Sequence, residues 1–255
     1  MTTSAYRLFV AALAAIAALT AACGGERTEE AAPAPAVTTN PVDPATAGRI
    51  TGAVRLEGTP PAAQPIRMDS DPYCVKQGDR VTETHVTGAG GALQNVFVYV
   101  KDGLGDLKFP VPSAPVALDQ KECRYVPHVL GIQVGQTLEI LSSDNTLHNV
   151  HAMPVENREF NKAHQMAGIR HTHVFSTREV MVPFKCDVHR WMNAYVGVLD
   201  HPFFAVSGAD GAFRIEGLPP GTYTIEAWHE ALGTQTQTVT IGTQETSDLT
   251  FTFRI

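Results

Sequence analysis

The chain has few charged residues and lacks the motifs of nucleotide-binding proteins and serine hydrolases. Charged residues make up 18% of the 255 residues, and the formal net charge is -7. No basic stripe follows the chain, so we do not expect a nucleic acid as a partner. Neither a G-x-x-x-x-G-K-[ST] phosphate loop nor a G-x-S-x-G nucleophile elbow occurs, which argues against both of those enzyme classes.

Long hydrophobic runs are also missing, apart from one at the N-terminus. Arg7 is followed by an almost purely apolar stretch, residues 8–19, which leads into Thr20-Ala21-Ala22-Cys23. This stretch is too short for a membrane-spanning helix, and it has the layout of a secretory signal. We therefore assign residues 1–22 to a signal peptide and expect the protein to be exported.

Cys23 directly follows two alanines and resembles the lipidated cysteine of a bacterial lipobox, although Thr20 stands where leucine is commoner. The resemblance implies a lipoprotein held to a bacterial membrane by its acyl chains, on the periplasmic or cell-surface side. Because Gly24 rather than aspartate follows Cys23, the outer membrane is favoured if the host has one. Ordinary signal cleavage is the alternative.

Residues 23–48 are expected to form a linker behind this anchor. They are mostly Ala, Pro, Thr and Glu without apolar periodicity, so they cannot offset their ordering entropy by burial. The prolines favour an extended chain, which would hold the folded part away from the membrane surface.

Beyond Gly48 the apolar residues have the periodicity of strands. Such patterns occur at residues 50–56, 95–100, 131–134 and 137–141, and turn residues separate them. No segment there has the periodicity of a helix. Many short strands between turns predict an all-β fold of the sandwich kind.

One short stretch, residues 183–192, contains a thiol, an imidazole and a thioether. Cys186, His189 and Met192 follow the pattern C-x-x-H-x-x-M, and His148 begins an HNVH segment 38 residues before Cys186. Two imidazoles, one thiolate and a weak axial thioether form the donor set of a blue-copper electron-transfer site.

These two segments resemble those of the cupredoxins, and within them most of all the amicyanin-like proteins. The similarity extends to an aromatic-x-Pro start at Tyr125 and to the I-x-x-G-x-x-L strand from Ile132, and it covers residues 123–200. The resemblance implies a Greek-key sandwich with one type 1 copper ion and a hydrogen bond from Asn149 across to the cysteine loop. The implied copper ligands are His148, Cys186, His189 and Met192.

The same resemblance implies an electron carrier and not an enzyme, with redox proteins of the envelope as partners. The exposed edge of His189 would be the electron port, and Trp191, Met153 and Pro154 would form the apolar rim where a partner docks. Oxidase chemistry is not expected, because only one H-x-H segment occurs and no C-x-x-x-C. The oligomeric state is not indicated.

Cysteine is scarce, with four residues in the chain. Lipidation of Cys23 would leave three, and an exported protein is expected to pair its thiols. Cys74 and Cys123 lie in loop-like settings and can form one disulfide, which leaves Cys186 as an odd thiol inside the ligand motif. A bridge between Cys74 and Cys186, or an inert buried Cys186, is the alternative, as is a purely structural Met192.

A second group of possible metal donors falls within residues 161–173. This group would favour a copper carrier or storage protein, which uses the same soft ligands but exchanges its metal, whereas a polar loop rich in histidine needs no metal at all. A structural or ligand-binding envelope protein is a third interpretation. The members of the group are His164, Met166, His171 and His173.

From His201 onward the sequence changes to alternating strands with Asp-Gly and Pro-Gly turns. A D-G-x-F segment at Asp210 and a G-L-P-P-G-x-Y segment at Gly217 resemble the carboxypeptidase regulatory-like module, a small transthyretin-like β-sandwich. We therefore divide the folded chain into a copper domain, residues 49–200, and this module, residues 201–255. Because the module normally has one more first strand, residues 50–61 belong either to it or to the copper domain.

Overall fold

The computed structural model describes residues 39–255, and two β-sandwiches contain nearly all of their regular structure. The all-β prediction is confirmed, since the helical elements among these residues are the single turn α1 (Pro72–Val75) and the 3-10 turn η1 (Ala89–Gly91). No helix in this part of the chain is long and apolar enough to cross a membrane. The predicted signal peptide and Cys23 lie outside the described residues.

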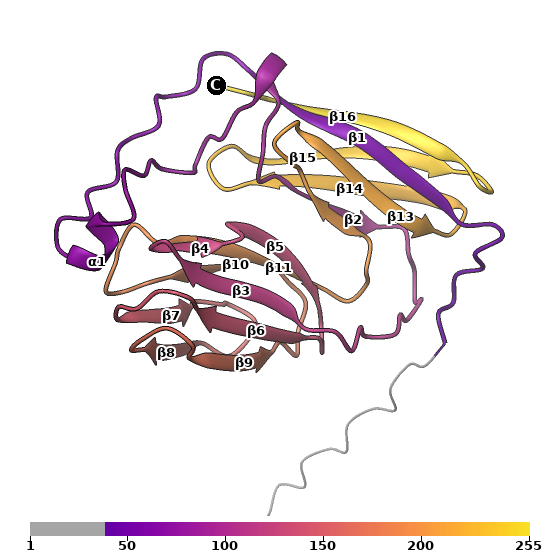
Figure 1. Cartoon of the computed structure of the whole chain (residues 1–255). Coiled ribbons are helices and arrows are strands. Elements are labelled where there is room, and N and C mark those ends of the chain that lie inside the picture. Colours follow the sequence, from indigo (N-terminus) through magenta and orange to yellow (C-terminus); the bar gives the residue numbers. More distant parts are fainter. Residues whose placement is uncertain (1–38) are drawn as a thin grey trace, which may run out of the picture. The chain divides into compact units, whose positions relative to one another are not determined.

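The first sandwich contains the strands of residues 116–199, arranged in two sheets whose buried faces share one core (Figure 1). Strand β6 shows the expected pattern, with buried and half-buried residues in strict alternation. The five-stranded sheet has the order β5 (Val129–Gln133), β11 (Asn193–Leu199), β10 (Glu179–Lys185), β7 (His148–Ala152) and β8 (Phe160–His164). The four-stranded sheet has the order β4 (Arg124–Val126), β3 (Val116–Lys121), β6 (Thr137–Ser142) and β9 (Arg170–Val174).

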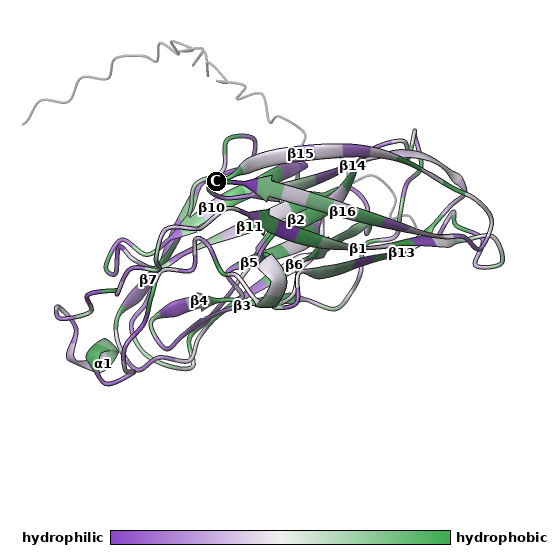
Figure 2. Ribbon diagram, turned by 90° about the horizontal axis from the view of Figure 1, so that it is seen from above, coloured by the Kyte–Doolittle hydropathy of each residue, from purple (hydrophilic) through white to green (hydrophobic). Residues whose placement is uncertain are grey.

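The second sandwich joins the two ends of the described chain. Figure 1 shows β1, in indigo, beside the yellow β16, and the two strands pair in parallel from Arg49–Thr246 to Glu57–Arg254. Hydrophobic and hydrophilic residues alternate along these strands (Figure 2). One sheet has the order β13 (Ala212–Leu218), β1 (Gly48–Glu57) and β16 (Thr246–Arg254). The other has the order β12 (Phe204–Val206), β2 (Phe97–Asp102), β14 (Gly221–His229) and β15 (Gly233–Ile241).

The pairing of the early strands differs in part from the division made on the sequence. Strand β1 pairs with β13 and β16, so residues 48–57 belong to the C-terminal sandwich. Strand β2, which the sequence placed in the copper domain, pairs with β12 and β14 of the same C-terminal sandwich. The end of the predicted linker is folded as well, because Val42 is only 8% exposed and packs into the core of this sandwich.

Aromatic side chains join the two sandwiches. Phe97 and Tyr99 on β2 share a buried cluster with residues of β5, β10 and β11. Gly131 on β5 and Gly197 on β11 are partners in register, and a Cβ atom at either position would come within 3 Å of the Phe97 ring. Both glycines are needed because the ring packs directly on their backbone.

Candidate metal centre

The predicted ligands converge at one end of the first sandwich. His148 begins β7, Cys186 directly follows β10, and His189 lies in the turn that leads to β11. Their donor atoms all lie within 4.8 Å of one another, and the Nδ1 atoms of His148 and His189 are 2.8 Å apart. The three side chains are buried, with exposed fractions of 0% for His148, 1% for Cys186 and 2% for His189.

This arrangement fits a small, soft metal ion. Two nitrogen ligands about 2.0 Å from one ion lie roughly 3.3 Å apart, close to the observed separation of the two Nδ1 atoms. A thiolate with two imidazoles is the trigonal set that copper sites of this kind use. Met192 is buried in the same core as Cys186, and its carbonyl oxygen accepts the Cys186 N–H at 3.1 Å. A copper ion would therefore be held by His148, Cys186 and His189, with Met192 beside them.

Asn149 holds the cysteine loop against β7. Its Oδ1 accepts the Asp187 N–H at 2.7 Å and the Val188 N–H at 3.3 Å, and its Nδ2 donates to the Asp187 carboxylate at 2.9 Å. Its own backbone N–H points at the Cys186 sulfur, 3.5 Å away, and so does that of His189, at 3.3 Å. These bonds orient the sulfur and brace the loop, as groups around metal ligands commonly do.

The environment of Cys186 favours its thiolate. Burial alone raises the pKa of this thiol, but hydrogen bonds from the His148 and His189 side chains and from the two backbone N–H groups outweigh it, so the pKa of Cys186 is lowered. The thiolate is the form that binds a metal.

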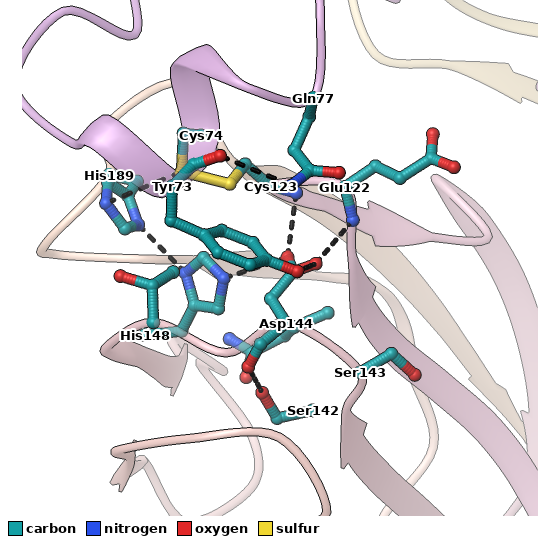
Figure 3. Close-up of polar contacts among 12 residues, drawn as sticks. Tyr73, Cys74, Gln77, Glu122, Cys123, Ser142, Ser143, Asp144, His148 and His189 are labelled. Atoms are coloured by element: carbon teal, nitrogen blue, oxygen red, sulfur yellow. Dashed lines mark hydrogen bonds and ion pairs between the residues drawn. A yellow bond between two sulfur atoms is a disulfide. The ribbon is translucent and has the colours of Figure 1, made fainter.

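One buried carboxylate, Asp144, and one half-buried carboxylate, Asp71, fix the orientation of the imidazoles. The Nε2 of His148 lies 3.0 Å from Oδ2 of Asp144 (Figure 3). The Nε2 of His189 lies 3.0 Å from Oδ2 of Asp71. Burial alone would raise the pKa of both carboxyl groups. Hydrogen bonds from the neighbouring side chains and backbone lower it by more, so the pKa of both is below its usual value and both are ionised. A carboxylate that accepts Nε2–H leaves Nδ1 of the same ring available to a metal.

Neither carboxylate was identified from the sequence. Asp144 precedes His148 by four residues and also accepts the backbone N–H groups of Glu122 and Cys123, each at 2.7 Å. Asp71 precedes Pro72 and caps α1, accepting the backbone N–H groups of Tyr73 and Cys74. The Asp-Pro signal for the start of a helix was available, but nothing in it indicates that the other carboxylate oxygen reaches His189.

The segment around α1 covers the side of the site that was expected to be open. The Cys74 sulfur lies 3.9 Å from Nε2 of His189, and the Tyr73 hydroxyl donates to Asp144 at 3.3 Å. Figure 3 shows α1 and its disulfide beside the two imidazoles. The expectation that His189 has an exposed edge for electron transfer is therefore wrong, because Asp71 and Cys74 occupy that edge.

The disulfide prediction is confirmed. Cys74 bonds to Cys123, which excludes a bridge between Cys74 and Cys186. Within residues 39–255 the one free cysteine is the buried Cys186. The disulfide fastens α1 to the turn between β3 and β4.

The three predicted docking residues do not lie together. Trp191 is half-buried, its ring centroid is 4.9 Å from that of His189, and its Nε1–H donates to the Cys123 carbonyl. Met153 and Pro154 follow the far end of β7, and Met153 lies about 13 Å along the strand from Asn149 at 3.3 Å per residue. The structure thus leaves Trp191 next to the site and separates the other two from it.

The second group of predicted donors is brought together in part. The ring centroids of His164 and His171 are 4.9 Å apart. His173 packs against Phe160 and Phe175, with centroid distances of 4.2 Å and 4.6 Å, and Met166 is largely exposed.

Comparison with known proteins identifies the module at the C-terminus. Residues 192–254 match the model of the carboxypeptidase regulatory-like domain. This match begins within the turn that carries the predicted ligands and leaves out β1 and β2, so it describes part of the chain. No curated protein matches the chain.

Solved structures that are similar to the chain include cupredoxins. A purple cupredoxin from Nitrosopumilus maritimus is 23% identical, with 32% of this chain and 98% of that chain covered and a TM-score of 0.28. A mutant of amicyanin in its Cu(I) form is 17% identical, with 40% and 97% covered and a TM-score of 0.30.

A copper-containing nitrite reductase from Thermus scotoductus is also similar, at 19% identity and a TM-score of 0.33. The match covers 40% of this chain but only 26% of the length of that enzyme. With TM-scores of this size, the metal assignment depends on the side chains of this chain.

Proposed function

We propose that the protein is an extracytoplasmic copper protein that carries single electrons between redox partners. The observation that supports this most is the orientation of the imidazoles. With Nε2 of His148 and His189 engaged by Asp144 and Asp71, the two Nδ1 atoms face each other at 2.8 Å. The ligand atoms of both histidines and of the buried Cys186 all lie within 4.8 Å of one another. A copper ion bound there would change between Cu(I) and Cu(II) and so accept and release one electron.

The residues around the site suit this role because they are held in place. Asn149 restrains the cysteine loop through hydrogen bonds, and Asp144 and Asp71 restrain the imidazoles of His148 and His189. A site that keeps its shape in both oxidation states has little to rearrange when an electron is transferred, and the buried position excludes water as a further ligand.

The route of the electron to the surface is part of the proposal. Asp71 and Cys74 close the edge of His189, whereas the half-buried Trp191 stacks beside that ring and lines a surface hollow with Ile66 and Arg124. We therefore assign the contact with redox proteins to the surface around Trp191.

Location and anchoring are likewise proposed. Export through residues 1–22 and lipidation at Cys23 would hold the copper sandwich near a bacterial membrane and raise its effective concentration towards membrane-bound redox partners. Mass spectrometry of the membrane fraction would detect an acylated N-terminal peptide beginning at Cys23, and an unmodified peptide would contradict the anchor.

The copper proposal is tested by optical and EPR spectra of the purified protein with Cu(II). We expect an intense visible charge-transfer band from the thiolate and a narrow hyperfine splitting in the wild type, and neither in Cys186→Ser. His85→Phe, which changes a histidine in the connection between β1 and β2, is the control. A visible band that survives in Cys186→Ser would contradict the assignment.

A further inference from the structure

His164 is a buried histidine whose ring nitrogens both lack a hydrogen-bond partner among the described residues. It is the last residue of β8, the edge strand of the five-stranded sheet. Buried polar atoms are nearly always paired, and a neutral imidazole offers one donor and one acceptor. Phenylalanine would suit this position better than histidine, unless the ring binds something else.

His171 faces this ring from the other sheet. It lies on β9, the edge strand of the four-stranded sheet, and its ring centroid is 4.9 Å from that of His164. Two imidazoles whose nitrogens lie about 2.0 Å from one metal, at an angle near 110°, have centroids roughly 5 Å apart. The separation of the two rings therefore suits a shared ion.

The surroundings select the kind of ion. No group of three His, Cys, Asp or Glu ligand atoms that includes His164 lies within 4.8 Å in residues 39–255, so the pair lacks the donors of a closed zinc site. Met166, in the turn between β8 and β9, is 55% exposed and is the neighbouring soft donor. Few ligands, two imidazoles and a thioether favour Cu(I). Burial lowers the pKa of His164 to about 4, so its ring is in the neutral form that binds metals.

We propose that His164 and His171 form a second, Cu(I)-binding site, with Met166 as its donor at the surface. The site lies next to the first one, because His164 is the direct partner of His148 in the antiparallel pairing of β7 with β8, where Cα atoms are about 5 Å apart. On the other side of the first site, α1 and its flanking residues cover His189. The second site is thus placed to receive Cu(I) from outside and pass it to His148 and Cys186.

This role in loading depends on the proposed copper centre, whereas the existence of the second site does not. Anaerobic titration with Cu(I) in competition with a chromophoric chelator separates the two. We expect the wild type and the control His85→Phe to bind two equivalents of Cu(I) per chain. We expect one equivalent for each of the variants His164→Phe, His171→Ala and Cys186→Ser. The double variant Cys186→Ser with His164→Phe should bind none.

The variants also show which proposal fails. Suppose that the wild type binds one equivalent of Cu(I), that His164→Phe binds none and that Cys186→Ser still binds one. The second site is then supported, and the proposed electron-transfer centre is contradicted. If His164→Phe and the more exposed His171→Ala both bind as much Cu(I) as the wild type, the second site is overturned.

The loading role has its own measurement. The ultraviolet absorption of the Cu(I) thiolate at Cys186, followed by stopped flow, should appear several-fold more slowly in His171→Ala than in the wild type or in His85→Phe. If His171→Ala binds one equivalent of Cu(I) less than the wild type but forms the Cu(I) thiolate at the same rate, the second site is supported and its role in loading is contradicted.

Discussion

Asp71→Asn should raise the reduction potential of the proposed copper centre. The carboxylate lies 3.0 Å from Nε2 of His189, and the imidazole ring and a metal–nitrogen bond of about 2.0 Å place its charge roughly 7 Å from the metal. A negative charge there stabilises Cu(II) more than Cu(I). Asparagine keeps the helix-capping oxygen but removes the charge, so Cu(II) loses part of its stabilisation.

The size of the effect follows from Coulomb's law. At roughly 7 Å and an effective dielectric constant of about 20 to 40, one charge contributes about 1 to 2.5 kcal/mol. For a one-electron couple this corresponds to an increase of about 50 to 100 mV. The side chain is 15% exposed, so the screening of a surface charge does not apply in full.

Voltammetry or a redox titration of the visible band measures this shift. Asp69→Asn, which removes an exposed charge two residues away, is the control and should change the potential little. Thr146→Val removes the hydroxyl that donates to Asp71 at 2.6 Å but keeps the charge, and its shift should be smaller than that of Asp71→Asn. If Asp71→Asn does not differ from Asp69→Asn, the carboxylate does not act on the metal as argued.

Two further predictions concern the axial position and the stability. Met192→Gln should keep copper bound but lower the reduction potential, because a harder donor favours Cu(II); an unchanged potential would make Met192 a core residue only. His201 is buried, donates from Nε2 to the Val100 carbonyl and accepts the Phe203 N–H, and burial lowers its pKa to about 4. Its contribution to stability is therefore full above the unfolded pKa of about 6.5 and is lost as the pH falls from there towards 4, by at most about 3 kcal/mol. Denaturant unfolding of His201→Phe should show a free energy that is lower at pH 7 and falls less steeply between pH 6.5 and 4, and equal slopes would contradict this account.

The sequence predicted those parts of the molecule that depend on local patterns. The apolar pattern indicated the strands, and the spacing of Cys186, His189 and Met192 indicated a set of metal donors within one short stretch. Which strands pair depends on contacts between distant residues, and this explains why β2 was placed in the wrong sandwich. Its continuous run of buried apolar residues suits a strand of either sandwich.

The carboxylates show the same limit at the site. Asp71 and His189 are 118 residues apart, and one aspartate in a loop looks like any other until the fold brings it to a ring nitrogen. The covered edge of His189 was missed for this reason, since the resemblance concerned the ligands and not the segment around α1 that packs over them.

The pairing of β1 with β16 has a consequence for how the chain reaches its fold. Arg49 and its partner Thr246 are 197 residues apart, so β1 is synthesised well before its parallel neighbour. The first sandwich, by contrast, has all of its strands within residues 116–199 and can close while the rest is still emerging. During that interval β1 exposes unpaired edges that are prone to aggregation, so residues 48–57 would need protection until residues 246–254 have been synthesised.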